Sequence, residues 1–172
     1  VIEGVEAVYR AKAQGKAVAW PLVEYKFENG GIMDIRSGGV LGDVGIHGAK
    51  LLNNFPKNAE ENLPVFTGIL MAFDSRTGLP IGVMDASYIT SLRTGAAAAI
   101  GAATLAKADS ETLLLVGAGR QAMYLLGATL LKMPQLRQVI VADPIDYENA
   151  VHFVESIEKR LKEELGIETG VI

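Results

Sequence analysis

Residues 111–131, ETLLLVGAGRQAMYLLGATLL, combine a short apolar run, a Gly117-Ala118-Gly119 turn and a second apolar run with helical spacing. The first run has the length of a buried strand, and the second repeats with the period of a helix. The stretch therefore predicts a strand that turns into a helix at the glycines. The glycines alone leave two interpretations open, a cradle for a phosphate group or a buried turn without a ligand.

Strands and helices continue to alternate after this stretch. A strand is predicted at 138–142, a helix at 148–165 and a further strand in the last residues, GIETGVI. Before it, the Ala- and Gly-rich residues 87–109 predict a long packed helix. Alternation of this kind is typical of a parallel sheet, so we expect part of a Rossmann-type doubly wound α/β domain. In the helix at 148–165, Glu158 and Lys162 stand four residues apart and are expected to pair.

Residues 18–86 are rich in strand patterns and differ from the rest of the chain. Their apolar runs are separated by Gly, Asn and Pro, and DSRTG at 74–78 has the length of a hairpin loop. Most runs are apolar on both faces, which favours a curved or covered antiparallel or mixed sheet. We therefore expect an α+β domain over 1–90 and the first half of a doubly wound domain over 91–172. The chain opens within a helical pattern and stops as a strand begins, so both domains are expected to be incomplete.

Composition excludes several classes of function. The chain has 172 residues, 49% of them hydrophobic, and a net charge of −4 without a basic cluster, which argues against nucleic acid and anionic membranes as partners. Its longest weakly polar run, TGAAAAIGAATLA, has 13 residues, fewer than the roughly 20 that span a bilayer. The absence of cysteine excludes disulfides and thiolate metal sites, and it fits a reducing compartment such as the cytoplasm.

The glycine turn matches a dinucleotide-binding motif, G-x-G-x-x-A, through Gly117, Gly119 and Ala122. The first glycine allows the tight turn, and the second allows backbone N–H groups to approach a pyrophosphate at the helix N-terminus. Asp143 ends the next apolar strand, 24 residues after Gly119, where a carboxylate can accept hydrogen bonds from ribose hydroxyls. No Arg or Lys follows in DPIDYENA, so NAD is expected over NADP. Asp143 could alternatively be an ordinary loop residue before Pro144.

Two cationic residues are candidates for binding an anion. The period of a strand places Lys50 among Ile46, Gly48 and Leu52, either as a cation in a cleft or at a sheet edge where it reaches water. Arg93 lies on the small-residue helix, where it either pairs internally or faces a bound anion.

The chain lacks the residues that several other kinds of enzyme site require. His47 and His152 occupy unrelated positions and are interpreted as structural, so no metal site is expected. The chain contains no P-loop, G-x-S-x-G or H-E-x-x-H motif. None of its five tyrosines is followed by Lys four residues later, which excludes the Tyr/Lys pair of short-chain dehydrogenases.

Several motifs together resemble those of the ornithine cyclodeaminase/mu-crystallin family. They are GAKLLNNFPKN at 48–58 and the run from LPVFTG through MDASYITSLRTG to VGAGRQA, with collinear spacing across about 45–143. The resemblance implies NAD(P)-dependent homodimers with a substrate-binding and dimerisation domain before the Rossmann domain. Such proteins act on amino acids or cyclic imines as cyclodeaminases, dehydrogenases or ketimine reductases. The alternative within the family is a non-catalytic protein that binds a dinucleotide and a small ligand, as mu-crystallin does.

The resemblance also implies roles for individual residues. Lys50 would hold the substrate carboxylate, and the cofactor would be bound by Arg93, Thr94, Gly117, Gly119, Arg120, Gln121 and Asp143.

Three features depart from the family pattern. The arginine that usually precedes the lysine by about two dozen residues is missing, and Lys26 and Arg36 are the possible substitutes. Val65 stands where cyclodeaminases tend to have Thr. The family's catalytic acid is expected beyond Ile172, so no catalytic residue is expected within the chain.

Overall fold

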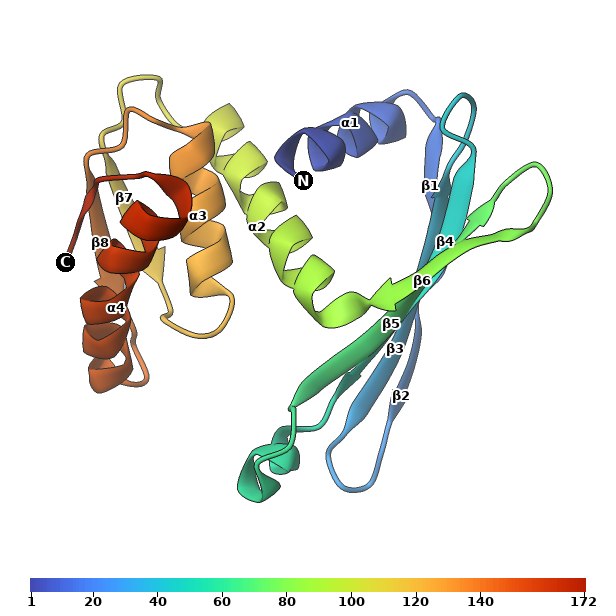
Figure 1. The fold of residues 1–172 in the computed structure, drawn as a ribbon, viewed down its shortest axis with the longest axis horizontal. Helices are drawn as coiled ribbons and strands as arrows, with labels where there is room; N and C mark the ends of the chain where they lie inside the picture. Colours follow the sequence, from blue (N-terminus) through green and yellow to red (C-terminus); the bar gives the residue numbers. More distant parts are fainter. The chain divides into compact units, whose positions relative to one another are not determined.

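The computed structural model describes residues 1–172 as two compact units (Figure 1). The antiparallel unit is Ala7–Thr90, and the α/β unit is Val1–Glu6 together with Ser91–Ile172. The elements are α1 (Ile2–Ala13), β1 (Ala17–Ala19), β2 (Val23–Lys26), β3 (Ile32–Val40), β4 (Ile46–Asn54), η1 (Pro56–Glu61), β5 (Phe66–Asp74), β6 (Pro80–Asp85), α2 (Ala86–Leu105), β7 (Thr112–Val116), α3 (Ala122–Lys132), β8 (Gln138–Ala142), α4 (Tyr147–Leu165) and β9 (Gly170–Val171).

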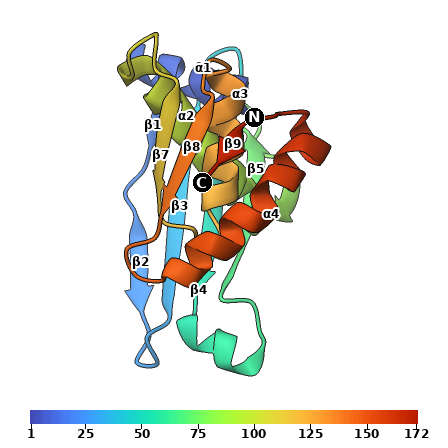
Figure 2. The same ribbon diagram turned by 90° about the vertical axis from the view of Figure 1, so that its left-hand side faces the viewer.

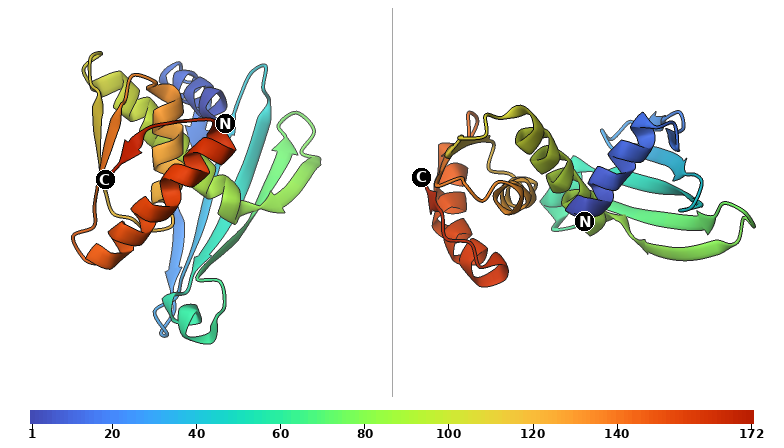
Figure 3. Two further views of the ribbon diagram at one scale, coloured as in Figure 1. Left: turned by 60° about the vertical axis from the view of Figure 1, so that its left-hand side comes forward. Right: turned by 90° about the horizontal axis from the view of Figure 1, so that it is seen from above.

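The antiparallel unit contains one sheet with strand order β1-β3-β4-β5-β6, and β2 also pairs with β3. The hairpin predicted at 74–78 joins β5 to β6 at the edge of the sheet (Figure 3). Asp74 accepts hydrogen bonds from the N–H groups of Arg76 and Thr77, at 2.9 and 2.7 Å, which closes the turn. Strand β4 lies in the interior of the sheet, where its neighbours on both sides hold its position.

One face of this sheet is more exposed than the sequence predicts. Val23, Ile35, Leu51 and Ile69 face one another across β2, β3, β4 and β5. Val23 and Ile69 at the ends of this row are 54% and 53% exposed. The expectation of a covered sheet is therefore wrong for this face within the chain, because no helix of the antiparallel unit packs over the row.

The α/β unit has a parallel sheet in the order β7-β8-β9, as the alternating pattern predicts. Its core lies between the sheet and the helices and includes Leu115, Leu126, Val139, Ile157 and Leu161. Helix α4 runs obliquely to the strands (Figure 2). The alternate strand residues Leu114 and Val116 are 59% and 64% exposed, so the helices cover one face of the sheet.

The side chain of Glu158 corrects one local prediction. Instead of pairing with Lys162, Glu158 accepts the backbone N–H of Val171 in β9 at 2.8 Å, while Lys162 pairs with Glu168 at 2.7 Å. The first of these contacts ties α4 to the strand that comes after it. None of the helices combines the length and the apolar character that a bilayer-spanning helix needs.

Candidate functional site

The glycine turn between β7 and α3 has the backbone that its sequence predicts. Gly117 has φ of +91°, a conformation that favours glycine, and its N–H donates to the carbonyl oxygen of Ala142 at 2.7 Å. A Cβ added at Gly119 would meet no protein atom within 4 Å, so the space above this residue is open. The turn therefore leaves room for a ligand beside its backbone, just before α3 begins.

Asp143 lies at the end of β8 and binds the glycine turn. Its Oδ2 accepts the N–H of Ala118 and the side-chain amide of Asn149, both at 3.1 Å. Its Oδ1 accepts the N–H groups of Ile145 and Asp146, at 3.1 and 3.2 Å. These donors, with the N–H groups of Ile145 and Ala118 foremost, lower the pKa of Asp143 to about 2. The carboxylate is therefore ionised at neutral pH and held in one position.

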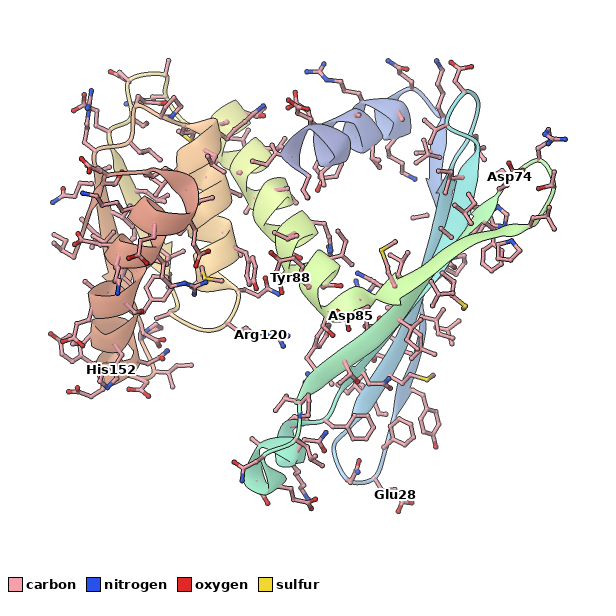
Figure 4. The ribbon with its side chains drawn as sticks, viewed as in Figure 1. Glu28, Asp74, Asp85, Tyr88, Arg120 and His152 are labelled. Atoms are coloured by element: carbon pink, nitrogen blue, oxygen red, sulfur yellow. The ribbon has the colours of Figure 1, made fainter.

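Gln121 connects the turn to α2. Its Nε2 donates to the hydroxyl of Ser91 at 3.3 Å, and its Oε1 is buried without a hydrogen-bond partner. An unsatisfied buried acceptor is costly, and a ligand that donates a hydrogen bond would satisfy it. Arg120 is exposed on the same turn (Figure 4).

Arg93 and Thr94 lie on α2, next to a close contact with α3. A Cβ at Gly95 would collide with the carbonyl oxygen of Tyr124, so the two helix backbones touch at this residue. Arg93 is exposed and Thr94 is half-buried. Both residues are therefore in the same unit as the glycine turn, on a helix that packs directly against α3.

Lys50 is in the antiparallel unit, in the middle of β4. The sheet-edge interpretation is wrong, because β3 and β5 pair with β4 on either side. The side chain is half-buried, and its Nζ donates to the hydroxyl of Thr90 on α2 at 2.9 Å. Asp85 fixes the start of that helix by accepting the N–H groups of Ser87 and Tyr88, at 2.9 and 3.1 Å (Figure 4).

The strand register distinguishes the two candidates for the missing arginine. Arg36 on β3 pairs directly with Lys50, so both side chains lie on the same face of the sheet. Asp34 holds the Arg36 guanidinium through two hydrogen bonds of 3.1 Å. Lys26 instead lies opposite Ile32, four residues along β3 from Arg36, and is exposed. Arg36 is therefore the cation that the sheet brings to Lys50.

A cavity of about 490 Å³ lies in the antiparallel unit, and Lys50 and Arg36 are among the residues that line it. Lys12 of α1 contributes a third cationic side chain, and no Asp or Glu lines the cavity. The other lining residues are mainly Gly, Ala and aliphatic residues. Its volume is within the range of small-molecule sites, and its charge suits an anion.

The side chains of the two histidines, His47 and His152, contact other side chains of the protein. His47 stacks on Phe73, with ring centroids 5.5 Å apart, and its Nδ1 lies 3.2 Å from the Ser75 hydroxyl. His152 is exposed on α4 and lies 3.6 Å from Glu155 (Figure 4). His47 also lines the cavity near Lys50, whereas His152 lies in the other unit.

The model of the ornithine cyclodeaminase/mu-crystallin family matches residues 1–169. The chain belongs to this family. An alanine dehydrogenase of Archaeoglobus fulgidus is 38% identical over 129 residues, which are 74% of this chain and 38% of that protein. The chain thus spans less than half of that relative.

Two solved structures share the fold over 99% of this chain. One is the Δ1-pyrroline-2-carboxylate reductase of Thermococcus litoralis with NADH and L-proline, with a TM-score of 0.85, 29% identity and 51% of that chain covered. The other is an archaeal alanine dehydrogenase dimer with bound NAD, with a TM-score of 0.85, 33% identity and 50% of that chain covered. These matches confirm the family and the fold class that the sequence predicts.

The α/β unit fits a dinucleotide by its own geometry. No protein atom lies within 4 Å of a Cβ placed at Gly119, and Gly117 has a positive φ, and both features are compatible with a glycine turn that binds a phosphate group at the start of α3. The sequence did not single out Thr90, Ser91 or Asn149, which contact Lys50, Gln121 and Asp143. No sequence signal could have identified Thr90 and Ser91 as contacts of Lys50 and Gln121, because 40 and 30 residues separate the two members of each pair.

Proposed function

We propose that the protein is an NAD-dependent oxidoreductase that acts on a small amino acid or a cyclic imine. The observation that carries the proposal is the glycine turn at the β7–α3 junction, with open space above Gly119. Membership of the family supports it, and the similar proteins include alanine dehydrogenase and Δ1-pyrroline-2-carboxylate reductase. When bound, NAD supplies hydride exchange between its nicotinamide ring and the Cα of the substrate.

The first task of the chain's own residues is to bind the cofactor. Gly117, Gly119, Arg120 and Gln121 bind the dinucleotide at the N-terminus of α3, and Arg93 and Thr94 of α2 contribute to the same cofactor site. The absence of Arg and Lys from 143–150, together with Asp146 and Glu148, supports NAD over NADP because a 2′-phosphate would be repelled.

Lys50 and Arg36 bind the substrate carboxylate. They face each other across β3 and β4 and line the same cavity, and Asp34 holds the Arg36 guanidinium in place. An ammonium and a guanidinium on one face can hold a carboxylate through charge-assisted hydrogen bonds, which orients the Cα of the substrate.

The working form is a homodimer in the cytoplasm. The exposed apolar row of Val23, Ile35, Leu51 and Ile69 is a surface that a second copy of the chain would cover. The similar archaeal alanine dehydrogenase, which is described as a dimer, supports the choice of a second copy as the partner. The absence of cysteine agrees with a reducing compartment.

The test uses Gly119→Val and an activity panel. A valine at this position meets no protein atom at its Cβ, so we expect parental thermal stability with NADH affinity at least about tenfold weaker. Titration of NADH fluorescence measures the affinity, and equal affinities for variant and parent contradict the proposal. NAD reduction with alanine, ornithine, lysine or proline separates an enzyme from a non-catalytic binding protein, which would bind NADH without turnover.

A further inference from the structure

Helix α2 carries two buried hydroxyl groups in succession. Thr90 is 6% exposed and Ser91 is 3% exposed. A buried hydroxyl is costly unless it forms a hydrogen bond. Another buried hydroxyl, that of Thr129 on α3, donates to the carbonyl oxygen of Leu125 one turn earlier at 2.7 Å, which is a common contact within a helix. Thr90 and Ser91 each accept a hydrogen bond from a side chain of another element.

The two donors are residues that we assign to the two ligand sites. Lys50, which we propose binds the substrate carboxylate, donates from its Nζ to Thr90 at 2.9 Å. Gln121, which we propose binds the cofactor, donates from its Nε2 to Ser91 at 3.3 Å. Thr90 is the last residue of the antiparallel unit, and Ser91 is the first residue of the second segment of the α/β unit. Each hydroxyl therefore lies in the same unit as the side chain that it contacts.

The backbone of α2 is held on either side of the two hydroxyls. Before them, Asp85 accepts the N–H groups of Ser87 and Tyr88, at 2.9 and 3.1 Å. After them, the close approach at Gly95 packs the helix against the backbone of Tyr124 on α3. Consecutive residues of an α-helix point about 100° apart. Two neighbouring side chains on one fixed helix can therefore contact two different partners.

We propose that Thr90 and Ser91 are positioning residues, Thr90 for Lys50 at the substrate site and Ser91 for Gln121 at the cofactor site. The inference rests on the proposed function, because it assigns roles beside those two sites. An ammonium group carries several N–H donors, so a bond to Thr90 is compatible with a bond to a carboxylate. Holding a long side chain before the ligand arrives reduces the entropy that binding removes.

The same reasoning applies to the amide of Gln121. Its nitrogen is held by Ser91, and its Oε1 is buried without a hydrogen-bond partner. With the nitrogen fixed, the oxygen keeps one orientation, in which a donor group of a bound cofactor can reach it. Loss of the Ser91 hydroxyl allows the amide to rotate, which weakens this contact.

Three variants test the role of Thr90. Thr90→Val keeps the volume and removes the hydroxyl, Thr90→Ala also removes it, and Thr90→Ser retains it. We expect KM for the amino acid to rise about fivefold or more in the Val and Ala variants and to stay within about twofold of the parent in the Ser variant. Steady-state kinetics at saturating NAD measures KM. Titration of NADH fluorescence should give parental affinity for all three variants.

Ser91→Ala is expected to show the opposite pattern. Its dissociation constant for NADH should rise about threefold or more, because Gln121 loses its acceptor, while KM for the amino acid at saturating NAD stays within about twofold of the parent. Thr129→Val is the control for both residues, because it removes a buried hydroxyl that bonds within its own helix. We expect it to leave KM and the NADH affinity unchanged.

Double-mutant cycles show whether each hydroxyl acts through its partner. In a Lys50→Met background, Thr90→Val should change KM by less than about twofold, because the side chain that Thr90 positions has lost its ammonium. In a Gln121→Met background, Ser91→Ala should likewise leave the NADH affinity within about twofold. Full additivity in either cycle contradicts the positioning role of that hydroxyl.

Two further outcomes overturn the inference. One is a KM in Thr90→Ser that rises as far as in Thr90→Val, since the hydroxyl is then not the group that matters. The other is parental KM and NADH affinity in Thr90→Val and Ser91→Ala with only thermal stability reduced, which makes both hydroxyls structural. A parent protein that neither binds NADH nor reduces NAD with any amino acid would instead contradict the proposed function, so the two failures are distinguishable.

Discussion

At the scale of single residues, Lys50 is the side chain whose role is most directly measurable. Lys50→Met keeps a similar length but removes the charge that we propose binds the substrate carboxylate. One charge-assisted contact contributes about 1.5–3 kcal/mol, so we expect KM for the amino acid substrate to rise about 10- to 100-fold. Steady-state kinetics with the most active amino acid of the panel measures the change. Lys26→Met is the matched control, because Lys26 is exposed on the same sheet and lies away from the row of Arg36 and Lys50.

Two results would assign Lys50 a purely structural role. One is a parental KM in Lys50→Met, and the other is a variant whose thermal stability falls while its KM stays the same. The second result would mean that the hydrogen bond from Lys50 to Thr90, 2.9 Å long, serves only to hold the first turns of α2 on the sheet.

At the scale of elements, α2 and α3 touch through a glycine. Gly95→Ala would drive a Cβ into the carbonyl oxygen of Tyr124, and backbone cannot move aside as a flexible side chain can. Overpacking of this kind costs about 1–3 kcal/mol, so we expect the free energy of unfolding to fall by that amount. Gly101→Ala is the control on the same helix, because its Cβ meets nothing within 4 Å. We expect this variant to gain about 0.5–1 kcal/mol, since alanine favours a helix.

Urea denaturation of the two variants and the parent measures both changes. Equal effects of Gly95→Ala and Gly101→Ala would contradict the close approach of α2 to α3.

At the scale of the whole molecule, the proposed dimer depends on the exposed face of the antiparallel sheet. Ile69→Glu places a charge at one end of the apolar row on that face, where a second copy would bury it without a partner. We expect the dimer to dissociate to monomers, with the sheet otherwise intact. Light scattering after size-exclusion chromatography measures the mass. Ile145→Glu is the control, because Ile145 is 95% exposed in the other unit, and a parental mass is expected for it.

A dimer that persists in Ile69→Glu would show that a different surface joins the copies, or that the apolar face has another partner. A parent that is monomeric at all concentrations would contradict the homodimer itself. Neither result affects the cofactor site, because Gly117, Gly119 and Asp143 lie in the α/β unit.

Local sequence was sufficient for the features that depend on neighbouring residues. The strand–turn–helix at 111–131, the hairpin at 74–78 and the alternation that forms a parallel sheet all result from spacing and from glycine at the turns. Gly117 is a clear case, since a positive φ of +91° is easily adopted by glycine and strained for other residues. The strand period marked Lys50 as a candidate anion-binding residue, and the family resemblance then implied that it holds the substrate carboxylate.

Only the tertiary structure decided which residues meet. The pairing of β3 with β4 placed Arg36, and not Lys26, opposite Lys50, because strand register is set by partners distant in sequence. The same is true of Asp143, whose position at a strand end predicts a ribose ligand. In the fold its oxygens accept hydrogen bonds from Ala118, Ile145, Asp146 and Asn149, because β7, β8 and α4 converge at that point. Spacing along the chain identifies this carboxylate, but only the fold shows which donors hold it in place.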